Sequence, residues 1–182
     1  MIPIYDFDQV SPEEIFSRET DRADVSGAVA AIIADVRQNG DSALLRYARE
    51  FDHAELTAVE VPREAMEAAA RGLDSELRAV MEEAAANIRD FHRRQRRESF
   101  VVSEKDGVIL GQKITPIEKV GLYIPGGTAA YPSSVLMNAI PAKLAGCREI
   151  VMVSPPTCGG DVNPVILAAA YIAGVDRVFR CG

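Results

Sequence analysis

Residues 119–156 read KVGLYIPGGTAAYPSSVLMNAIPAKLAGCREIVMVSPP, and this stretch decides the fold. An apolar run at 119–124 precedes Pro125-Gly126-Gly127, and a helix-like segment that Gly146 ends follows it. A second apolar run then begins at Glu149 and ends in prolines. Short apolar runs that alternate with helical segments indicate parallel strands joined by crossover helices.

The same alternation continues toward residue 182. Residues 163–174 read as a helix that Asn163 and Pro164 open and Gly174 ends, and DRVFRC at 176–181 reads as a third strand. This β-α-β-α-β order predicts an α/β fold with an incomplete doubly wound, Rossmann-like parallel half. We expect the sheet to look cut after its last strand, with backbone groups of that strand left unpaired.

The chain before residue 117 reads as helices followed by a β-hairpin. Ser11, Asp41 and Asp74 are predicted N-caps. Asp106-Gly107 lies between β-rich runs and is a typical two-residue hairpin turn. We therefore expect a helical region with a β-hairpin at 1–116 and the incomplete Rossmann-like half at 117–182. The expected helices are 11–19, 24–39, 42–51, 62–72 and 74–97, and the expected strands of this region are 58–62, 99–104 and 108–115.

Composition excludes several classes of protein. The formal net charge of -7 argues against a nucleic-acid-binding protein, because phosphate neutralisation needs clustered positive charge. The basic run at 93–97 follows a long helical pattern, where the helix dipole favours cations. No apolar run is long enough to span a membrane. Cys147, Cys158 and Cys181 are an odd number without metal-like spacing, which favours a reducing cytoplasm.

The Pro125-Gly126-Gly127 loop has two interpretations. Ligands of open parallel sheets bind beyond the carboxyl ends of the strands, which is where this loop lies. Its glycines would let backbone approach a ligand, and the free N–H groups near Ser133-Ser134 would favour an anion. Glycines also serve tight turns, however, and no G-x-G-x-x-G fingerprint occurs in the chain. Tyr123, directly before the loop, could stack on a nucleotide base or pack beneath the loop.

No catalytic constellation is visible in the sequence. His53 and His92 are the only histidines, and neither has cysteine neighbours at ligand spacing. No serine lies in a G-x-S-x-G elbow. The residues alone therefore indicate a binding loop without a catalytic site.

Three segments resemble the histidinol dehydrogenase family: VGLYIPGGTAAYPSSVLMNAIPAKLAGCREIVMVSPP, ANIRDFHRRQ and GGDVNPVILAAAYIAGVDRVFRCG. This family oxidises L-histidinol to L-histidine through the aldehyde with NAD, as a cytoplasmic homodimer that holds a zinc ion. The resemblance implies that Tyr123 contacts NAD, and that residues 117–182 form an NAD-binding half.

Family members are much longer than this chain. The resemblance implies that the zinc ligands and the catalytic residues belong to sequence after residue 182, so none is assigned here. We expect an N-terminal portion that is inactive by itself. Two other interpretations stay open: a non-catalytic nucleotide-binding or assembly module of a short relative, and an incomplete reading frame.

Overall fold

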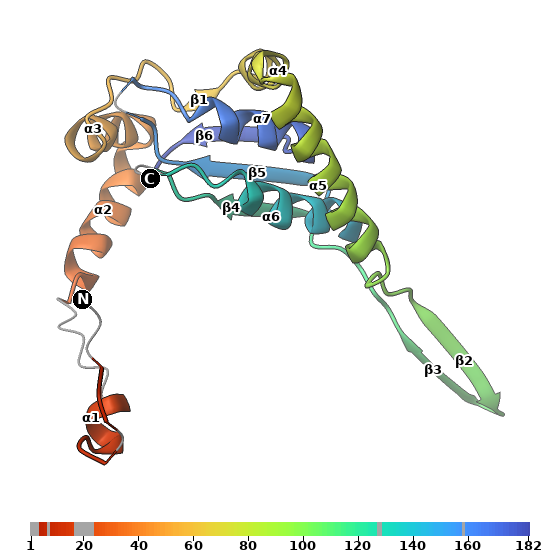
Figure 1. Cartoon of the computed structure of the whole chain (residues 1–182). Coiled ribbons are helices and arrows are strands. Elements are labelled where there is room, and N and C mark those ends of the chain that lie inside the picture. The colour runs from red at the N-terminus through yellow and green to blue at the C-terminus, as the bar shows by residue number, and fades with distance from the viewer. Residues whose placement is uncertain (1–3, 7, 17–23, 127–128, 158) are drawn as a thin grey trace.

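The computed structural model describes residues 4–6, 8–16, 24–126, 129–157 and 159–182 (Figure 1). Its centre is a sheet of four strands in the order β1-β6-β5-β4. A separate two-stranded sheet, β2-β3, projects away from this centre.

The parallel half of the fold is confirmed. β4 (Lys119–Tyr123), β5 (Glu149–Ser154) and β6 (Arg177–Arg180) are parallel neighbours. α6 (Pro132–Ala145) connects the first two strands and runs through Pro141, while α7 (Pro164–Ala173) connects the second pair. Both helices end at a left-handed glycine, as their sequences predict.

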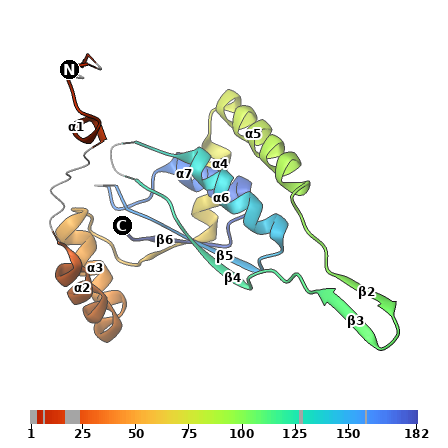
Figure 2. The ribbon, with the colours of Figure 1, turned by 90° about the horizontal axis from the view of Figure 1, so that it is seen from below.

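The hydrophobic core lies between one face of the sheet and the helices. Ile150 and Met152 of β5 and Val178 of β6 are fully buried there. These residues alternate with less buried neighbours, because successive side chains of a strand point to opposite faces. α6 and α7 cover the core side, and α4 (Arg63–Gly72) and α5 (Ser75–Arg93) pack behind them as an outer layer (Figure 2).

β1 (Glu60–Val61) corrects one expectation about the sheet. It pairs antiparallel with β6, placing Glu60 opposite Phe179 and Val61 opposite Val178. The N–H of Arg180 also donates to the Val59 carbonyl at 2.8 Å. The prediction that the last parallel strand has an unpaired edge is therefore wrong over these residues. Its partner comes from a distant part of the chain, so no neighbouring residue pattern reveals the pairing.

Contacts cross the expected boundary near residues 115–119. β1 joins the sheet of the C-terminal half, α4 packs on α7, and α5 packs on α6. The division into 1–116 and 117–182 stays a prediction, and the two regions share one hydrophobic core.

The predicted hairpin consists of β2 (Phe100–Lys105) and β3 (Val108–Gln112). Gly107 occupies its turn with φ of 75°, a conformation that glycine adopts without steric cost. β3 ends earlier than expected. Every residue of both strands is exposed, and the hairpin extends beyond the end of α5 (Figure 1).

Two of the predicted helix caps are confirmed. The N–H of Glu14 donates to Ser11 Oγ at 3.2 Å, at the start of α1 (Pro12–Phe16). Asp74 accepts from the N–H groups of Glu76 and Leu77 and so caps α5.

The other helix boundaries need small corrections. Asp41 is the first residue of α3 (Asp41–Phe51) and makes no capping bond; Gly40, with φ of 56°, occupies the cap position and separates α3 from α2 (Ser26–Asn39). α5 ends at Arg93 rather than near residue 97. Across the described ranges, no helix combines the length and hydropathy needed to cross a membrane.

Candidate functional site

The carboxyl ends of β4, β5 and β6 meet at one edge of the sheet, because the strands are parallel. The described segments at this carboxyl edge are 124–126 and 129–131 after β4, 155–157 and 159–163 after β5, and 181–182 after β6. This is the place where sequence reasoning put the ligand-binding loop.

Tyr123 is the last residue of β4 and is 59% exposed. Its register partner is Val153 of β5, and the register partner of Val153 is Phe179 of β6. The three side chains therefore form a transverse row on the sheet face opposite the buried core. Among the described residues Tyr123 is exposed beside the carboxyl edge, and its role as a cofactor contact stays a prediction.

Gly126 is explained in part by packing. A Cβ atom there would lie 3.2 Å from Pro155 Cγ and 3.3 Å from the Pro155 carbonyl oxygen. A Cβ on Gly182 would also crowd Pro155, at 3.1 Å from its Cβ. Three segments of the edge thus converge on one proline. This favours the structural interpretation for Gly126, while Gly127 and Thr128 lie outside the described residues.

Arg180 fixes the loop after β5. Its Nε donates to Asp161 Oδ1 at 3.0 Å, and its side chain is only 14% exposed. Its Nη1 donates to the carbonyls of Ala58 and Glu60, each at 3.1 Å. The loop is closed by the N–H of Thr157, which donates to the Asp161 carbonyl at 2.8 Å. One guanidinium therefore ties this loop to β6 and to the β1 segment.

The N-terminus of α6 faces the same edge. Its first residue is Pro132, and among the described residues no side chain caps it. The N–H of Ser134 donates to the Tyr131 carbonyl at 3.1 Å. In contrast, Asn163 caps α7 by accepting from the N–H of Val165 at 2.9 Å. The N–H of Ser134 is therefore not free, contrary to the expectation, and among the described residues α6 is the one of these two helices that lacks a side-chain cap.

A cleft of about 200 Å³ lies beside the edge, between α3 and the end of β6. Burial raises the pKa of Asp52 in this cleft, against the opposing effect of His53. Burial and the Asp52 carboxylate also raise the pKa of the Cys181 thiol. Sequence reasoning missed this cleft because its two walls are distant in the chain and neither carries a motif.

The two histidines lie in different segments, and only His92 is part of a helix. His53 follows α3 with φ of 53°, and His92 lies on α5 with its Nδ1 2.6 Å from Gln95 Oε1. Within the part of the chain that the structure describes, no group of three or more His, Cys, Asp or Glu side chains is placed to hold a metal ion.

The fold and the carboxyl edge define an α/β protein with a partly parallel, Rossmann-like sheet. A sequence model of histidinol dehydrogenase matches residues 16–182, and the chain belongs to this family. The histidinol dehydrogenase of Geobacillus kaustophilus is 52% identical over 155 residues, which cover 85% of this chain and 37% of that protein. The one from Listeria innocua is 49% identical over 158 residues, covering 87% of this chain and 37% of that protein.

A solved structure agrees with the sequence comparison. The crystal structure of histidinol dehydrogenase from Elizabethkingia anophelis superposes with a TM-score of 0.84 at 36% identity. The superposition covers 90% of this chain and 38% of that one. The chain therefore spans somewhat more than a third of the length of the relatives that it matches.

Proposed function

We propose that this chain forms part of an NAD-dependent histidinol dehydrogenase, which oxidises L-histidinol to L-histidine through the aldehyde in the cytoplasm. Membership of the family, over residues 16–182, carries this proposal. The chain would contribute one wall of the NAD site at the carboxyl edge and would work within a homodimer. By itself it would be inactive.

The residues at the carboxyl edge have the chemical groups that a dinucleotide site needs. Tyr123 offers an exposed ring on which a nicotinamide or adenine ring can stack. The N-terminus of α6, which has no side-chain cap among the described residues, offers a favourable dipole for a pyrophosphate. The loop 155–163, held by Arg180 through Asp161, would give the cofactor a fixed neighbour.

NAD, when bound, supplies the hydride acceptor for each oxidation step. The role left to this chain is to orient the cofactor, with Tyr123 restricting its ring and the edge loops excluding water from one side. Zinc does not fit the described residues, because no three ligand side chains converge. A zinc ion in the complete enzyme would need ligands from the part of the relatives that this chain does not span.

The test of the cofactor site is Tyr123→Ala. Saturation-transfer NMR should detect weak NAD binding to the chain, and Tyr123→Ala should weaken that binding about tenfold, since stacking on one base contributes about 1–3 kcal/mol. Tyr123→Phe, which keeps the ring, should bind like the original. Tyr171→Ala, on α7 and 38% exposed, is the matched control.

Tight NAD binding that ignores Tyr123→Ala would place the site elsewhere. Formation of NADH from L-histidinol and NAD by the 182-residue chain alone would refute its inactivity. Reading the gene on past the codon for Gly182 separates the enzyme portion from a non-catalytic module, because only the former continues with histidine-bearing segments.

A further inference from the structure

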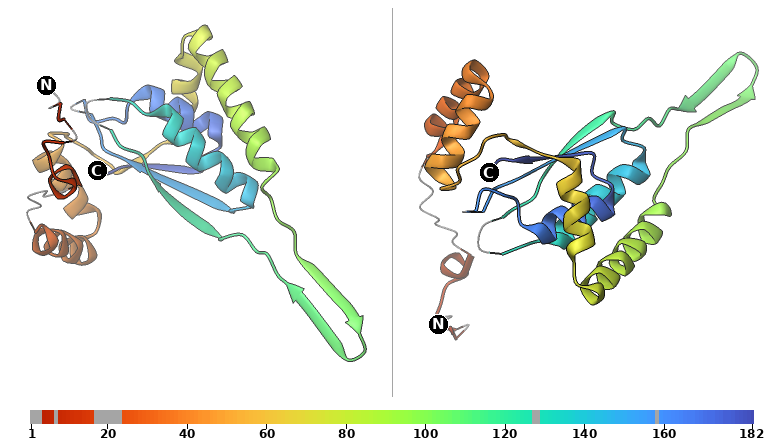
Figure 3. Two further views of the ribbon diagram at one scale, coloured as in Figure 1. Left: turned by 60° about the horizontal axis from the view of Figure 1, so that its bottom comes forward. Right: turned by 90° about the horizontal axis from the view of Figure 1, so that it is seen from above.

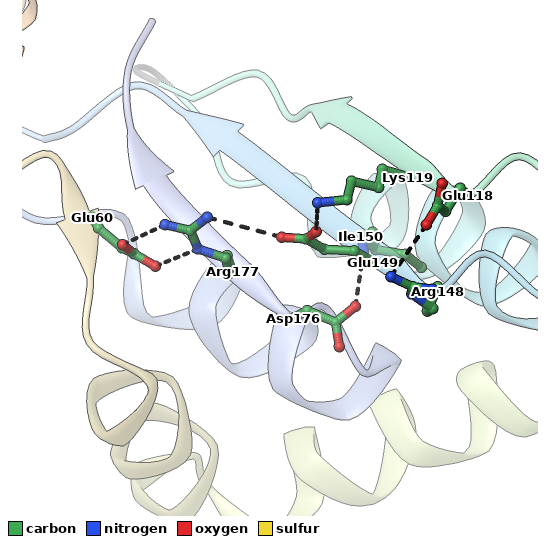
Figure 4. A network of polar contacts seen from close by, with 8 residues as sticks. All are labelled: Glu60, Glu118, Lys119, Arg148, Glu149, Ile150, Asp176 and Arg177. Atoms are coloured by element: carbon green, nitrogen blue, oxygen red, sulfur yellow. Dashed lines mark hydrogen bonds and ion pairs between the residues drawn. The ribbon is translucent and has the colours of Figure 1, made fainter. Parts of the chain in front are cut away.

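One group of charged side chains, which crosses the central sheet, is satisfied internally (Figure 4). Arg177 Nε lies 2.8 Å from Glu60 Oε1, and Lys119 Nζ lies 2.7 Å from Glu149 Oε2. Arg177 Nη1 is also 3.9 Å from Glu149 Oε1, and the Arg177 guanidinium stacks over the Phe179 ring at 4.8 Å. Each cation of this network already has a carboxylate beside it, so the network has little charge left for a ligand.

A groove of about 500 Å³ on the helical side of the sheet has a different balance of charge. It lies between α4 and α5, which diverge from their short connection beside the C-terminal end of α7 (Figure 3). Three arginines and two glutamates line it: Arg71, Arg78, Arg89, Glu67 and Glu82. Its lining is therefore net positive, although the chain has a formal net charge of -7. Grooves of this size hold small organic ligands.

Arg89 is a cation of this groove without an anionic partner among the described residues. The positions one turn away on α5 are occupied by Ala85, Ala86, His92 and Arg93, so its own helix supplies no carboxylate. Across the described ranges Arg89 takes part in no ion pair. Its side chain is nevertheless partly buried. A bound anion would compensate for the hydration that this guanidinium has lost.

Arg78 lies three helical turns before Arg89 and on the same face of α5. Its Nε donates to the Ala70 carbonyl at 3.1 Å, and its Nη2 donates to the same oxygen. These bonds hold the guanidinium between the end of α4 and the start of α5. Among the described residues Arg78 Nη1 has no acceptor. Arg78 is therefore a positioned cation that still has a donor available for a ligand.

The two glutamates limit what the groove can bind. Glu67 is paired with Arg71 at 2.9 Å, so these two charges largely cancel. Glu82 lies about 6 Å beyond Arg78 along the axis of α5, and the whole span from Arg78 to Arg89 is about 16 Å. The Glu82 carboxylate disfavours a negative group in the middle of this span. A suitable ligand thus has its negative charges at its two ends.

We propose that the groove between α4 and α5 binds an elongated organic dianion, of which an α,ω-dicarboxylate is the simplest form. One carboxylate accepts hydrogen bonds from Arg78 and the other from Arg89, since a guanidinium suits the two oxygens of a carboxylate. The uncharged middle of the ligand lies over the small side chain of Ala85 and against Ile172 of α7.

This site is separate from the proposed NAD site. α7 begins after the carboxyl end of β5 and ends before the amino end of β6. Ile172, near the C-terminus of α7, therefore lies at the opposite end of that helix from the carboxyl edge. The dianion site does not rest on the proposed function.

The test is a titration of the isotope-labelled 182-residue chain with suberate, followed by NMR. Amide signals of α4 and α5 should shift along a saturating curve, and succinate should bind more weakly because it is too short to reach both arginines. Arg89→Gln should weaken suberate binding about tenfold, since it removes charge-assisted hydrogen bonds. Arg93→Gln is the matched control, because Arg93 lies one turn further along α5, is exposed and does not line the groove.

Equal affinities for succinate and suberate, or for the original chain and Arg89→Gln, would overturn the proposal, as would the absence of binding at millimolar suberate. If circular dichroism shows that Arg89→Gln does not fold, Arg89→Lys replaces it. This variant keeps the charge and should still bind several-fold more weakly, because an ammonium cannot donate two parallel hydrogen bonds. Unchanged binding by Arg89→Lys would contradict the role of the guanidinium.

Two further variants test the placement of the ligand. Glu82→Gln should tighten suberate binding, because it removes a negative charge beside a dianion. Weaker binding by this variant would contradict the placement along α5. Tyr123→Ala should leave suberate binding unchanged, and a loss would place the dianion at the carboxyl edge instead. Loss of NAD binding alone in Tyr123→Ala bears only on the proposed function.

Discussion

The central sheet and the β2-β3 hairpin are built from similar apolar, β-branched residues but reach opposite states of burial. In β5, Ile150 and Met152 are inaccessible to solvent, whereas Val101 of β2 is 73% and Ile109 of β3 is 75% exposed. The central sheet has helices packed on one face, whereas β2 and β3 of the hairpin form a two-stranded sheet of their own, in which every residue is exposed. A two-stranded hairpin is at best marginally stable in water. Strand propensity thus creates both elements, but only the covered one contributes a core.

The largest expected effect is in the covered sheet. Met152→Ala should lower the free energy of unfolding by about 2–5 kcal/mol, because it removes a fully buried side chain and leaves a cavity. Met137→Ala is the matched control, since Met137 of α6 is 53% exposed. Urea unfolding followed by circular dichroism measures both. Similar losses for the two variants would break the contrast between covered and exposed regions.

A smaller effect on stability is expected from the ion pairs that join Glu60, Arg177, Glu149 and Lys119 across the sheet. Hydrogen bonding to Arg177 lowers the pKa of Glu60, and bonding to Lys119 lowers that of Glu149. A lowered carboxyl pKa stabilises the fold above the unfolded value near 4.5, and the stabilisation is lost as the pH falls through the folded value. Arg177→Gln should therefore lower the Tm at neutral pH, but less than Met152→Ala does.

The pH dependence separates this effect from a packing defect. The difference in Tm between the original chain and Arg177→Gln should shrink as the pH falls below about 4.5, because the carboxylates then become protonated and lose their ion pairs. Asp52 has the opposite sign, because burial raises its pKa and its contribution is lost as the pH rises. A difference in Tm that stays constant with pH would mean that Arg177 acts by packing on Phe179 alone.

The smallest effect is expected in the hairpin. Ile109→Thr should change the free energy of unfolding by less than about 0.5 kcal/mol, since it alters an exposed side chain without a buried contact. The same urea titration measures it. A loss as large as that of Met152→Ala would show that the hairpin is covered in solution, and the contrast between the two regions would then fail.

Much of the local structure could be predicted from the sequence. Asp74, the Asp106-Gly107 turn, Asn163 with Pro164, and the glycines after α6 and α7 act within a few residues of their position, so short-range patterns reveal them. The pairing of β1 with β6 could not be read, because register between distant segments depends on the complete fold. The burial of individual helix faces could not be predicted either. Val29 and Ile33 of α2 have the spacing of a core-facing stripe, yet no residue of α2 is buried.

For the candidate site, the sequence predicted the edge but not its geometry. The position of Tyr123 followed from strand order, and its assignment to NAD, which came from resemblance, stays a prediction. The contacts of Arg180 with Asp161, and the cleft that contains Asp52, depend on segments brought together only by folding. The crowding of Gly126 against Pro155 likewise has no signature in the order of residues.

That crowding has a mechanical consequence. Gly126 and Gly182 both lie so near Pro155 that a Cβ atom at either position would crowd it, and a side chain there would need a neighbour to shift. A bulkier residue at position 126 would displace the loop after β5. That displacement would also affect Asp161 and its ion pair with Arg180. The described parts of the two loops should therefore respond together to a substitution at position 126.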